Sequence, residues 1–334
     1  MSAQVHITGA GVAGLVLAAE LTARGADVSI WDRNGAPGPH GCSWWAGGML
    51  APFCEGATAE PEVVRWGQEA ADWWHALGVP VTRSGTLVVA PARDGAELAR
   101  FARRAPQHDP VDGAGIDALE PDLAGRFSRG LYYRDEAHLD PRTALARLIT
   151  TLRSRGVEVA RTADASTTGT AVVATGYAAR HALTDLRGVK GEMLVLHCPD
   201  VAITRPIRLM HPRFPAYLVP RGDGVYMLGA TQIESADGSR VTARSLVDLL
   251  NAAYAIHPAF ADAEVVEIGV DLRPAFPDNL PRIRWVDGAL HLNGLFRHGF
   301  LLAPALGRMA ADHILNTDQI PEVLDESHPE RLPV

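Results

Sequence analysis

QVHITGAGVAGLVLAAELTARGADVSIWD, residues 4–32, is the stretch that decides the fold. Gln4–Thr8 has the composition of a short buried strand, and the helical spacing over residues 15–24 ends at Gly25. A second strand is predicted at Asp27–Trp31, directly before Asp32. This order of strand, glycine loop, helix, strand and acidic residue is typical of a dinucleotide-binding unit.

Each glycine of the loop Gly9-Ala10-Gly11-Val12-Ala13-Gly14 has a separate task in such a unit. Gly9 allows the tight turn, Gly11 lets the backbone approach a pyrophosphate, and Gly14 lets the helix pack closely on the strand. The helix N-terminus offers free N–H groups to the phosphates, and Asp32 would accept hydrogen bonds from ribose hydroxyls. A plain glycine turn is the alternative, and the motif alone does not separate FAD from NAD.

The loop over residues 35–56 is the second informative region, and it ends in GCSWWAGGMLAPFCEG. Its glycine and proline content argues against regular structure, and long ordered loops in compact domains are often functional. The small residues 46–48 would let the backbone pass close to a flat cofactor ring. The alternative is an exposed loop with a buried tryptophan pair, Trp44 and Trp45.

Composition narrows the class of protein. At 334 residues, with 47% hydrophobic and 21% charged residues, the chain is long enough for two domains. Its net charge of -8 argues against nucleic acid as a partner, because such binders usually show a basic excess or stripe. Its three cysteines, Cys42, Cys54 and Cys198, include no C-x-x-C pair, which fits a reducing compartment better than disulfides or a zinc site. We therefore predict a cytoplasmic protein.

The apolar N-terminal stretch lacks the features of a targeting or membrane segment. It has no basic leader, and Glu20 and Arg24 stand where a membrane span would have to continue. The sequence predicts neither a signal peptide nor a transmembrane helix.

Periodicity predicts further helices and strands along the chain. Helices are predicted over residues 61–77, 143–155, 243–254 and 300–315, and strands over 81–90, 157–159, 171–174, 192–196, 217–220, 225–230, 264–272, 282–286 and 290–293. We interpret Asp140, before Pro141, as a helix N-cap rather than a catalytic acid. The apolar strand that ends in Thr175-Gly176 suits a backbone beside a cofactor, and a core strand with a turn is the alternative.

Seven stretches together resemble the glycine oxidase and D-amino acid oxidase family over nearly the full chain. They are GAGVAGL with Asp32, SWWAGGMLAP (43–52), VVATGYAAR (172–180), VKGEML (189–194), YLVPRGDGVYMLGAT (217–231), DLRPAFPDNLPRI (271–283) and FRHGFLLAPALG (296–307). The resemblance is closest to the glycine oxidases of thiamine biosynthesis. It implies an α/β fold, with a Rossmann-type FAD-binding domain and a substrate domain built on a mostly antiparallel sheet. The FAD-binding domain would comprise residues 1–76, 140–186 and 275–318, the substrate domain 77–139 and 187–274, and a tail 319–334.

The resemblance also implies a non-covalently bound, extended FAD. The residues implied to contact it are Gly9, Gly11, Ala13, Gly14, Asp32, Arg33, Ser43, Gly47, Gly48, Met49, Val159, Thr175, Gly176, Arg297, His298, Gly299, Phe300 and Leu301. Val159 and Thr175-Gly176 would flank the adenosine, and the turn 297–301 would donate N–H groups near the pyrimidine end of the flavin. No cysteine lies in residues 273–283, where related sarcosine oxidases tether their flavin.

Arg273, Arg297, Tyr217 and Met49 are the substrate-side residues that the resemblance implies. A guanidinium pairs with both oxygens of a carboxylate, so arginine suits the orientation of an amino acid, and Arg273 is the first choice. Without the resemblance, either arginine is more often part of a salt bridge, and Tyr217 is a candidate packed tyrosine.

The implied reaction is hydride transfer from the α carbon of a small amino acid, glycine first, to flavin N5. The implied products are glyoxylate or dehydroglycine, with ammonia and hydrogen peroxide. Gln232 and the Trp44–Trp45 pair depart from the family pattern and leave substrate size open. An oxidase or dehydrogenase for a D-amino acid, sarcosine or another secondary amine is one alternative. A non-enzymatic flavin-binding or redox-sensing protein is another.

Partners and metal sites complete the expectations. Dioxygen is the implied electron acceptor, and a homo-oligomer and a thiazole synthase are candidate partners. His138, His211 and His298 do not have metal-ligand spacing, so we predict no metal site.

Overall fold

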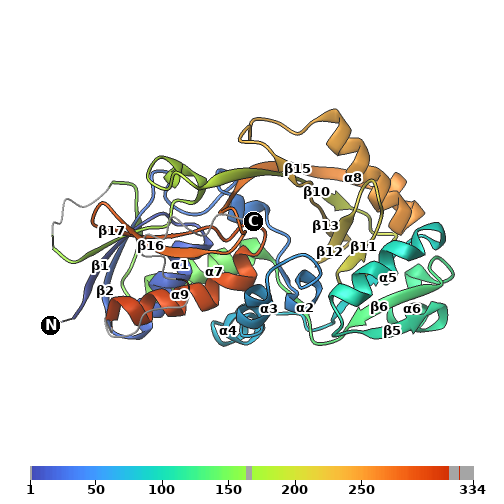
Figure 1. Ribbon diagram of the computed structural model, residues 1–334, viewed down its shortest axis with the longest axis horizontal. Helices are drawn as coiled ribbons and strands as arrows, with labels where there is room; N and C mark the ends of the chain where they lie inside the picture. Colours follow the sequence, from blue (N-terminus) through green and yellow to red (C-terminus); the bar gives the residue numbers. More distant parts are fainter. Residues whose placement is uncertain (1, 163–167, 316–322, 324–334) are drawn as a thin grey trace.

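Two sheets form the framework of the protein, and Figure 1 shows them in the left and right halves of the molecule. The computed structural model describes residues 2–162, 168–315 and 323. The first sheet has six strands, in the spatial order β16 (Arg282–Val286), β17 (Ala289–Asn293), β9 (Thr170–Val173), β1 (Gln4–Thr8), β2 (Asp27–Trp31) and β8 (Val159–Ala160). Neighbouring strands of this sheet run parallel, except for β16 and β17, which form an antiparallel hairpin.

Helices α1 (Val12–Ala23), α7 (Pro141–Ser154) and α9 (Gly299–Leu315) pack together beside this sheet (Figure 1). Most residues of α1 are buried and apolar because it contacts strands of the sheet as well as α7 and α9. Gly307 allows the close approach of α9, since a Cβ atom there would lie 2.9 Å from Cγ1 of Val16. The N-cap prediction for α7 is confirmed, because the side chain of Asp140 accepts a 2.8 Å hydrogen bond from the N–H of Arg142.

The second sheet has nine strands and is antiparallel except where β4 pairs with β11. Its path is β14 (Ile233–Glu234), β10 (Arg187–His197), β13 (Val225–Gly229), β12 (Ala216–Gly222), β11 (Ile207–Leu209), β4 (Thr86–Val89), β6 (Arg129–Tyr133) and β5 (Asp109–Asp112), and β15 (Glu264–Ala275) also pairs with β10. Helix α8 (Ala243–Ile256) packs on β10 to β13, over a second apolar core. The predicted α/β fold with a mostly antiparallel second sheet is confirmed.

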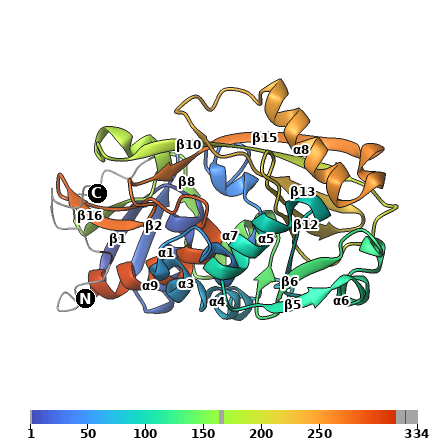
Figure 2. The same ribbon diagram turned by 45° about the vertical axis from the view of Figure 1, so that its right-hand side comes forward.

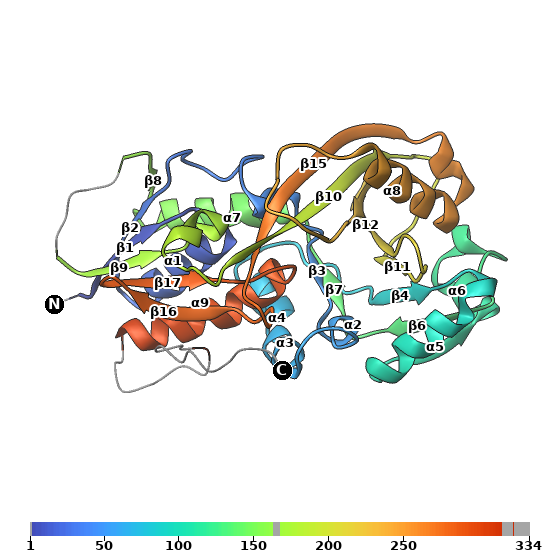
Figure 3. The same ribbon diagram turned by 45° about the horizontal axis from the view of Figure 1, so that its top comes forward.

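The long strands β10 and β15 lead from the second sheet toward the first, as Figures 2 and 3 show. Their antiparallel register pairs Val189 with Arg273 and Gly191 with Asp271. Because side chains alternate along a strand, Arg273 and Asp271 lie on the same face of β15.

The remaining elements are short. They are the strand pair β3 (Met49–Leu50) and β7 (Ala137–His138), the helices α2 (Pro52–Glu55), α3 (Pro61–Gly67), α4 (Ala70–Ala76), α5 (Gly95–Arg104) and α6 (Gly113–Leu119), and the 3-10 helices η1 (Cys42–Trp45), η2 (Ala92–Asp94), η3 (Pro121–Leu123), η4 (Gly176–His181) and η5 (Pro258–Ala261). No helix in the described ranges is both long and apolar enough to cross a membrane.

Three predicted elements were wrong in detail. The single helix predicted over 61–77 is two helices, α3 and α4, and the break lets each of them contact α9. The strand predicted over 81–90 begins only at Thr86, because Gly85 turns the chain with φ of 73°. The loop over 35–56 is not wholly irregular, since it contains η1, β3 and α2. Apart from Val323, the predicted tail 319–334 lies outside the described residues.

Candidate functional site

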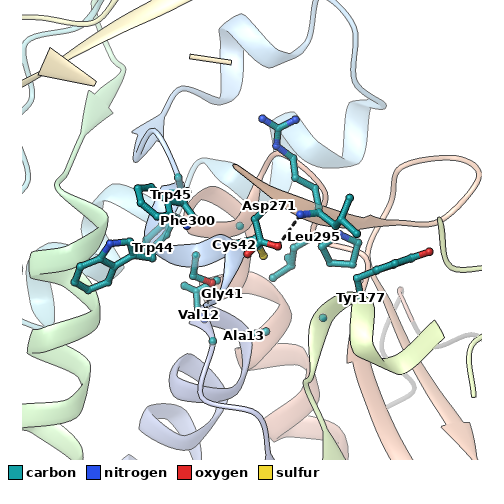
Figure 4. Close-up of a pocket in the computed structure, with 18 of the residues that line it drawn as sticks. Val12, Ala13, Gly41, Cys42, Trp44, Trp45, Tyr177, Asp271, Leu295 and Phe300 are labelled. Carbon is teal, nitrogen blue, oxygen red and sulfur yellow. Dashed lines mark hydrogen bonds between the residues drawn. The ribbon is translucent and has the colours of Figure 1, made fainter. Parts of the chain in front are cut away.

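A cavity of about 690 Å³ lies between the two sheets and is lined by residues from both. Figure 4 shows that α1, η1 and β15 converge on it. From the first sheet it receives the glycine turn after β1 and Thr175-Gly176 after β9. From the second sheet it receives Tyr217 and the segment 271–274. Its volume is within the range of ligand and cofactor sites.

The glycine turn leaves no room for side chains. Gly9 has φ of 110°, and a Cβ atom on it would lie 2.4 Å from the carbonyl oxygen of Ala174. A Cβ atom on Gly14 would lie 2.0 Å from the oxygen of Gly9, so Gly14 serves helix packing and does not line the cavity. Gly11 and Ala13 do line it, at the N-terminal end of α1. This end therefore presents backbone N–H groups and a partial positive charge to the cavity, as a pyrophosphate requires.

Two polar side chains flank this helix start. Asp32 follows β2, and its carboxylate accepts hydrogen bonds from the N–H groups of Ala10 at 3.0 Å and Asn34 at 2.8 Å. A carboxylate has further lone pairs, which remain for ribose hydroxyls. Ser43 on η1 accepts a 3.1 Å hydrogen bond from the N–H of Val12. Together with the glycine turn, Asp32 fits the ADP half of a dinucleotide, and Arg33 beside it also lines the cavity.

A wall of small residues forms another side of the cavity. The wall consists of Ala46, Gly47 and Gly48, and Met49, which follows it, also lines the cavity. A Cβ atom on Gly47 would lie 2.8 Å from the ring of Tyr217. Gly48 has φ of 74°, and a Cβ atom on it would lie 2.2 Å from the oxygen of Leu139. The tight fit explains why this stretch has no larger side chains.

Thr175 and Gly176 line the cavity, but Val159 does not. Gly176 has φ of 57°, and its carbonyl accepts a 2.9 Å hydrogen bond from the side chain of Asn293. Val159 pairs with Ile30 in β8, at the edge of the first sheet. The structure therefore brings together all the residues that sequence reasoning proposed except Gly14 and Val159.

Arg273 enters the cavity from β15 without an anionic partner. Its Nη1 donates a 3.0 Å hydrogen bond to the carbonyl oxygen of Thr231, and no carboxylate among the described residues forms an ion pair with it. Burial lowers its pKa, but an arginine side chain stays charged at neutral pH. Tyr217 lines the same cavity, and its hydroxyl has no hydrogen-bond partner in the described part of the chain. Both groups are thus available to a ligand carboxylate.

Arg297 has partners of its own. Its Nη2 lies 3.5 Å from Oε1 of Glu55, and its Nη1 lies 3.4 Å from the side-chain oxygen of Gln232. Glu55 also pairs with Arg208 at 3.0 Å and with Nε2 of His298 at 3.0 Å. Burial opposes the ionisation of Glu55, but these cationic and hydrogen-bonding neighbours outweigh it and hold the pKa well below its usual range.

His298 is buried, and one of its ring nitrogens lacks a partner. Because ionised Glu55 can only accept, Nε2 donates the hydrogen bond, and Nδ1 has no partner among the described residues. His298, Gly299, Phe300 and Leu301 all line the cavity at the start of α9. The N-terminus of α9 therefore also faces the cavity, in addition to that of α1.

Sequence reasoning missed several polar cavity residues, among them Glu55, Cys42 and Asp271. Asp271 lies two residues before Arg273 on the same face of β15, and burial raises its pKa. Burial also raises the pKa of the Cys42 thiol to about 12, with Asp271 acting in the same direction. The alternation along β15 could have indicated Asp271. Only the tertiary fold could have indicated the cluster around Glu55.

His138 and His211 lie outside this cavity. His138 pairs with Met49 through the strands β7 and β3, and His211 stacks on the ring of Phe214 at 3.6 Å between centroids. Both therefore have structural contacts.

Comparison with known proteins gives one family. The family model described as FAD dependent oxidoreductase (DAO) matches residues 4–313. A Rhizobium etli protein named "Putative thiamine biosynthesis oxidoreductase ThiO" is 50% identical over 328 residues, which cover 96% of this chain and 98% of that protein. A glycine oxidase of Pseudomonas aeruginosa is 28% identical, covering 93% of this chain and 94% of its own length.

Solved structures show the same fold. The crystal structure of glycine oxidase from Geobacillus kaustophilus superposes with a TM-score of 0.78 at 24% identity, and the match covers 96% of each chain.

Proposed function

The chain belongs to the DAO family of FAD-dependent oxidoreductases, and from this premise we propose that it oxidises the amine of a small amino acid, with glycine as the leading substrate. FAD is the cofactor of the family, and the glycine turn, the start of α1 and Asp32 fit its ADP half. Bound FAD supplies the hydride acceptor.

The unpaired guanidinium of Arg273 is the observation that carries the substrate class. A partly buried arginine without a carboxylate partner leaves charge uncompensated, and a substrate carboxylate would compensate it. Tyr217, beside it in the cavity wall, would donate its hydroxyl to the same carboxylate. Holding the carboxylate fixes the α carbon, which is the main contribution these residues make to the reaction.

The other site residues are proposed in supporting roles. Ser43 and residues 47–49 would lie along the flavin, and Thr175 and Gly176 along the adenosine. The N–H groups at the start of α9, residues 297–301, would stabilise negative charge on the pyrimidine side. We also propose the division into an FAD-binding domain and a substrate domain at the boundaries given above.

The function is tested by anaerobic titration of the purified holoenzyme with glycine, sarcosine and D-alanine. We expect glycine to bleach the oxidised flavin band, and admission of air to restore the band with one hydrogen peroxide per glycine oxidised. If sarcosine reduced the flavin better than glycine, the substrate would be a secondary amine. If D-alanine did so, the substrate would be a D-amino acid. No bleaching by any of the three would overturn the substrate class.

The proposal extends to the pathway, the electron acceptor and the cellular location of the protein. The name of the Rhizobium etli relative places that protein in thiamine biosynthesis, and we propose that this chain supplies the same pathway through a thiazole synthase, with dioxygen as electron acceptor. The free thiols of Cys42, Cys54 and Cys198 support a cytoplasmic location. Analytical ultracentrifugation, alone and with the thiazole synthase, tests the proposed homo-oligomer and the partner.

A further inference from the structure

Arg221 lies behind the wall of small residues and is bound to its backbone. Its Nη1 donates a 2.6 Å hydrogen bond to the oxygen of Leu139, and its Nη2 donates to the oxygens of Ala46 at 3.2 Å and Gly47 at 2.9 Å. One guanidinium thus joins two segments that are more than ninety residues apart in sequence. Neither segment supplies a side chain to these contacts.

The strand that carries Arg221 is irregular at this position. In the pairing of β12 with β13, Pro220 lies opposite Tyr226 and Gly222 lies opposite Val225, so Arg221 has no partner in the register. An extra residue of this kind redirects a side chain, and such bulges are frequent next to active sites. The irregularity is therefore the feature that turns Arg221 toward the wall.

The charge of Arg221 is not used in an ion pair. No carboxylate lies within ion-pair distance among residues 2–162, 168–315 and 323, and burial lowers its pKa to about 10, which still leaves it protonated at neutral pH. A partly buried arginine is costly to retain for carbonyl contacts alone. Carbonyl oxygens are good acceptors for a charged donor, and a planar fork with several N–H groups can reach three of them at once.

The other contacts that hold the wall are made by backbone. Gly47 and Gly48 have no side chains, and their backbone must stay close to the ring of Tyr217 and to Leu139. A hydrogen bond from the N–H of Leu139 to the oxygen of Gly48 at 2.9 Å joins the same segments, and the pairing of β3 with β7 begins at the next residue, Met49. Loss of Arg221 would therefore leave three carbonyls without their donor and free the wall to move.

We propose that Arg221 is a positioning residue that holds the segment 46–48 in the shape the bound flavin requires. It acts through the wall and touches neither substrate nor reacting atoms. The inference rests on the proposed function only in that this wall faces FAD. Whether glycine is the substrate does not affect it.

The test compares Arg221→Met and Arg221→Lys in the holoenzyme. FAD dissociation is followed by the fluorescence of released flavin, and amide hydrogen exchange is measured across residues 44–50. We expect Arg221→Met to raise the dissociation rate about tenfold, as loss of charged hydrogen bonds implies, and to raise exchange in that segment. For Arg221→Lys, we expect a dissociation rate and an exchange rate between those of the wild type and Arg221→Met, because one ammonium group cannot span three carbonyls.

A matched control is Arg205→Met. Arg205 also donates to backbone carbonyls, those of Ser84 at 2.9 Å and Leu119 at 2.8 Å, and pairs with Glu120, but the residues it binds do not line the cavity. This variant should lose thermal stability while its flavin dissociates at the wild-type rate. Unchanged flavin release and exchange in Arg221→Met would overturn the inference. If that variant does not fold, wild-type behaviour of Arg221→Lys would overturn it. Altered flavin release with no oxidation of any amino acid would retain the role of Arg221 and reject the proposed function.

Discussion

The guanidinium of Arg273 lies directly over the backbone of Gly191, so that a Cβ atom added to this glycine would come within 2.3 Å of Nη2. The two residues lie on the paired strands β15 and β10, and Gly191 stands opposite Asp271, two residues from Arg273. The absence of a side chain at Gly191 therefore lets the arginine lean across the sheet into the cavity.

Gly191→Ala should displace Arg273 without changing its charge. A misplacement of about 1 Å in a positioning group can cost on the order of 100-fold in rate, so we expect kcat/KM for glycine to fall about 10- to 100-fold. Steady-state kinetics of the FAD-loaded variant test this. Gly95→Ala is the control, because nothing lies within 4 Å of a Cβ atom there. Wild-type kinetics in Gly191→Ala would mean that the arginine reaches the substrate from another position.

Arg273 and Arg297 should differ in their effect on substrate binding. Arg273 has only a carbonyl partner, whereas Arg297 lies near Glu55 and Gln232. We expect Arg273→Met to lower kcat/KM by about 100-fold, because it removes a two-point contact to a carboxylate, and Arg297→Met by less than about tenfold. Kinetics of both variants at saturating FAD make the comparison. Equal losses would show that Arg297 leaves Glu55 to bind the substrate.

Local sequence patterns predicted the framework well. The strands β1, β2 and β16 have the predicted bounds, because each is a short run of strand-forming residues that ends at a clear turn. The start of α7 was predictable for a similar reason, since a cap depends only on the residues beside it. The helix over 61–77 was not predicted correctly, because its break depends on packing against the distant α9.

The site residues also include some that local sequence predicts and others that only the tertiary structure brings together. The glycine turn and Asp32 lie within one continuous stretch, so their proximity could be inferred from spacing alone. Glu55, Arg208 and His298 come from three separate elements, α2, β11 and the turn before α9. No periodicity relates them, and only the tertiary structure brings their charges together. The same is true of Arg221 and the carbonyls that it binds.

Cys42 lines the cavity, yet it should not form a covalent bond to the flavin. The thiolate is the reactive form, and burial raises the pKa of this thiol to about 12, so almost none is ionised at neutral pH. Acid precipitation of the holoenzyme should release all the flavin into the supernatant, as measured by its absorbance. Cys42→Ser should behave identically. Yellow colour retained in the precipitate of the wild type but not of the variant would contradict this prediction.

Glu136 should make the protein less stable as the pH rises toward 7. The residue is 1% exposed, its Oε1 accepts a 2.7 Å hydrogen bond from the N–H of Cys54, and its Oε2 has no partner among the described residues. Burial raises its pKa from 4.5 to about 7. Between these values the folded protein holds a proton that the unfolded chain has released, so stability falls as the pH rises through this window.

The Glu136→Gln variant tests this, since an amide can accept the same hydrogen bond but does not titrate. One pKa unit corresponds to about 1.4 kcal/mol, so the free energy of unfolding of the wild type should decrease relative to the variant by about 3 kcal/mol between pH 4.5 and 7. Denaturant unfolding at several pH values, with FAD at one saturating concentration, measures the difference. Asp135→Asn, at the exposed neighbouring position, is the control and should follow the wild type. Parallel pH profiles for the wild type and Glu136→Gln would show that Glu136 is ionised in the folded protein throughout this range, and that the positive charge of Arg208 outweighs its burial.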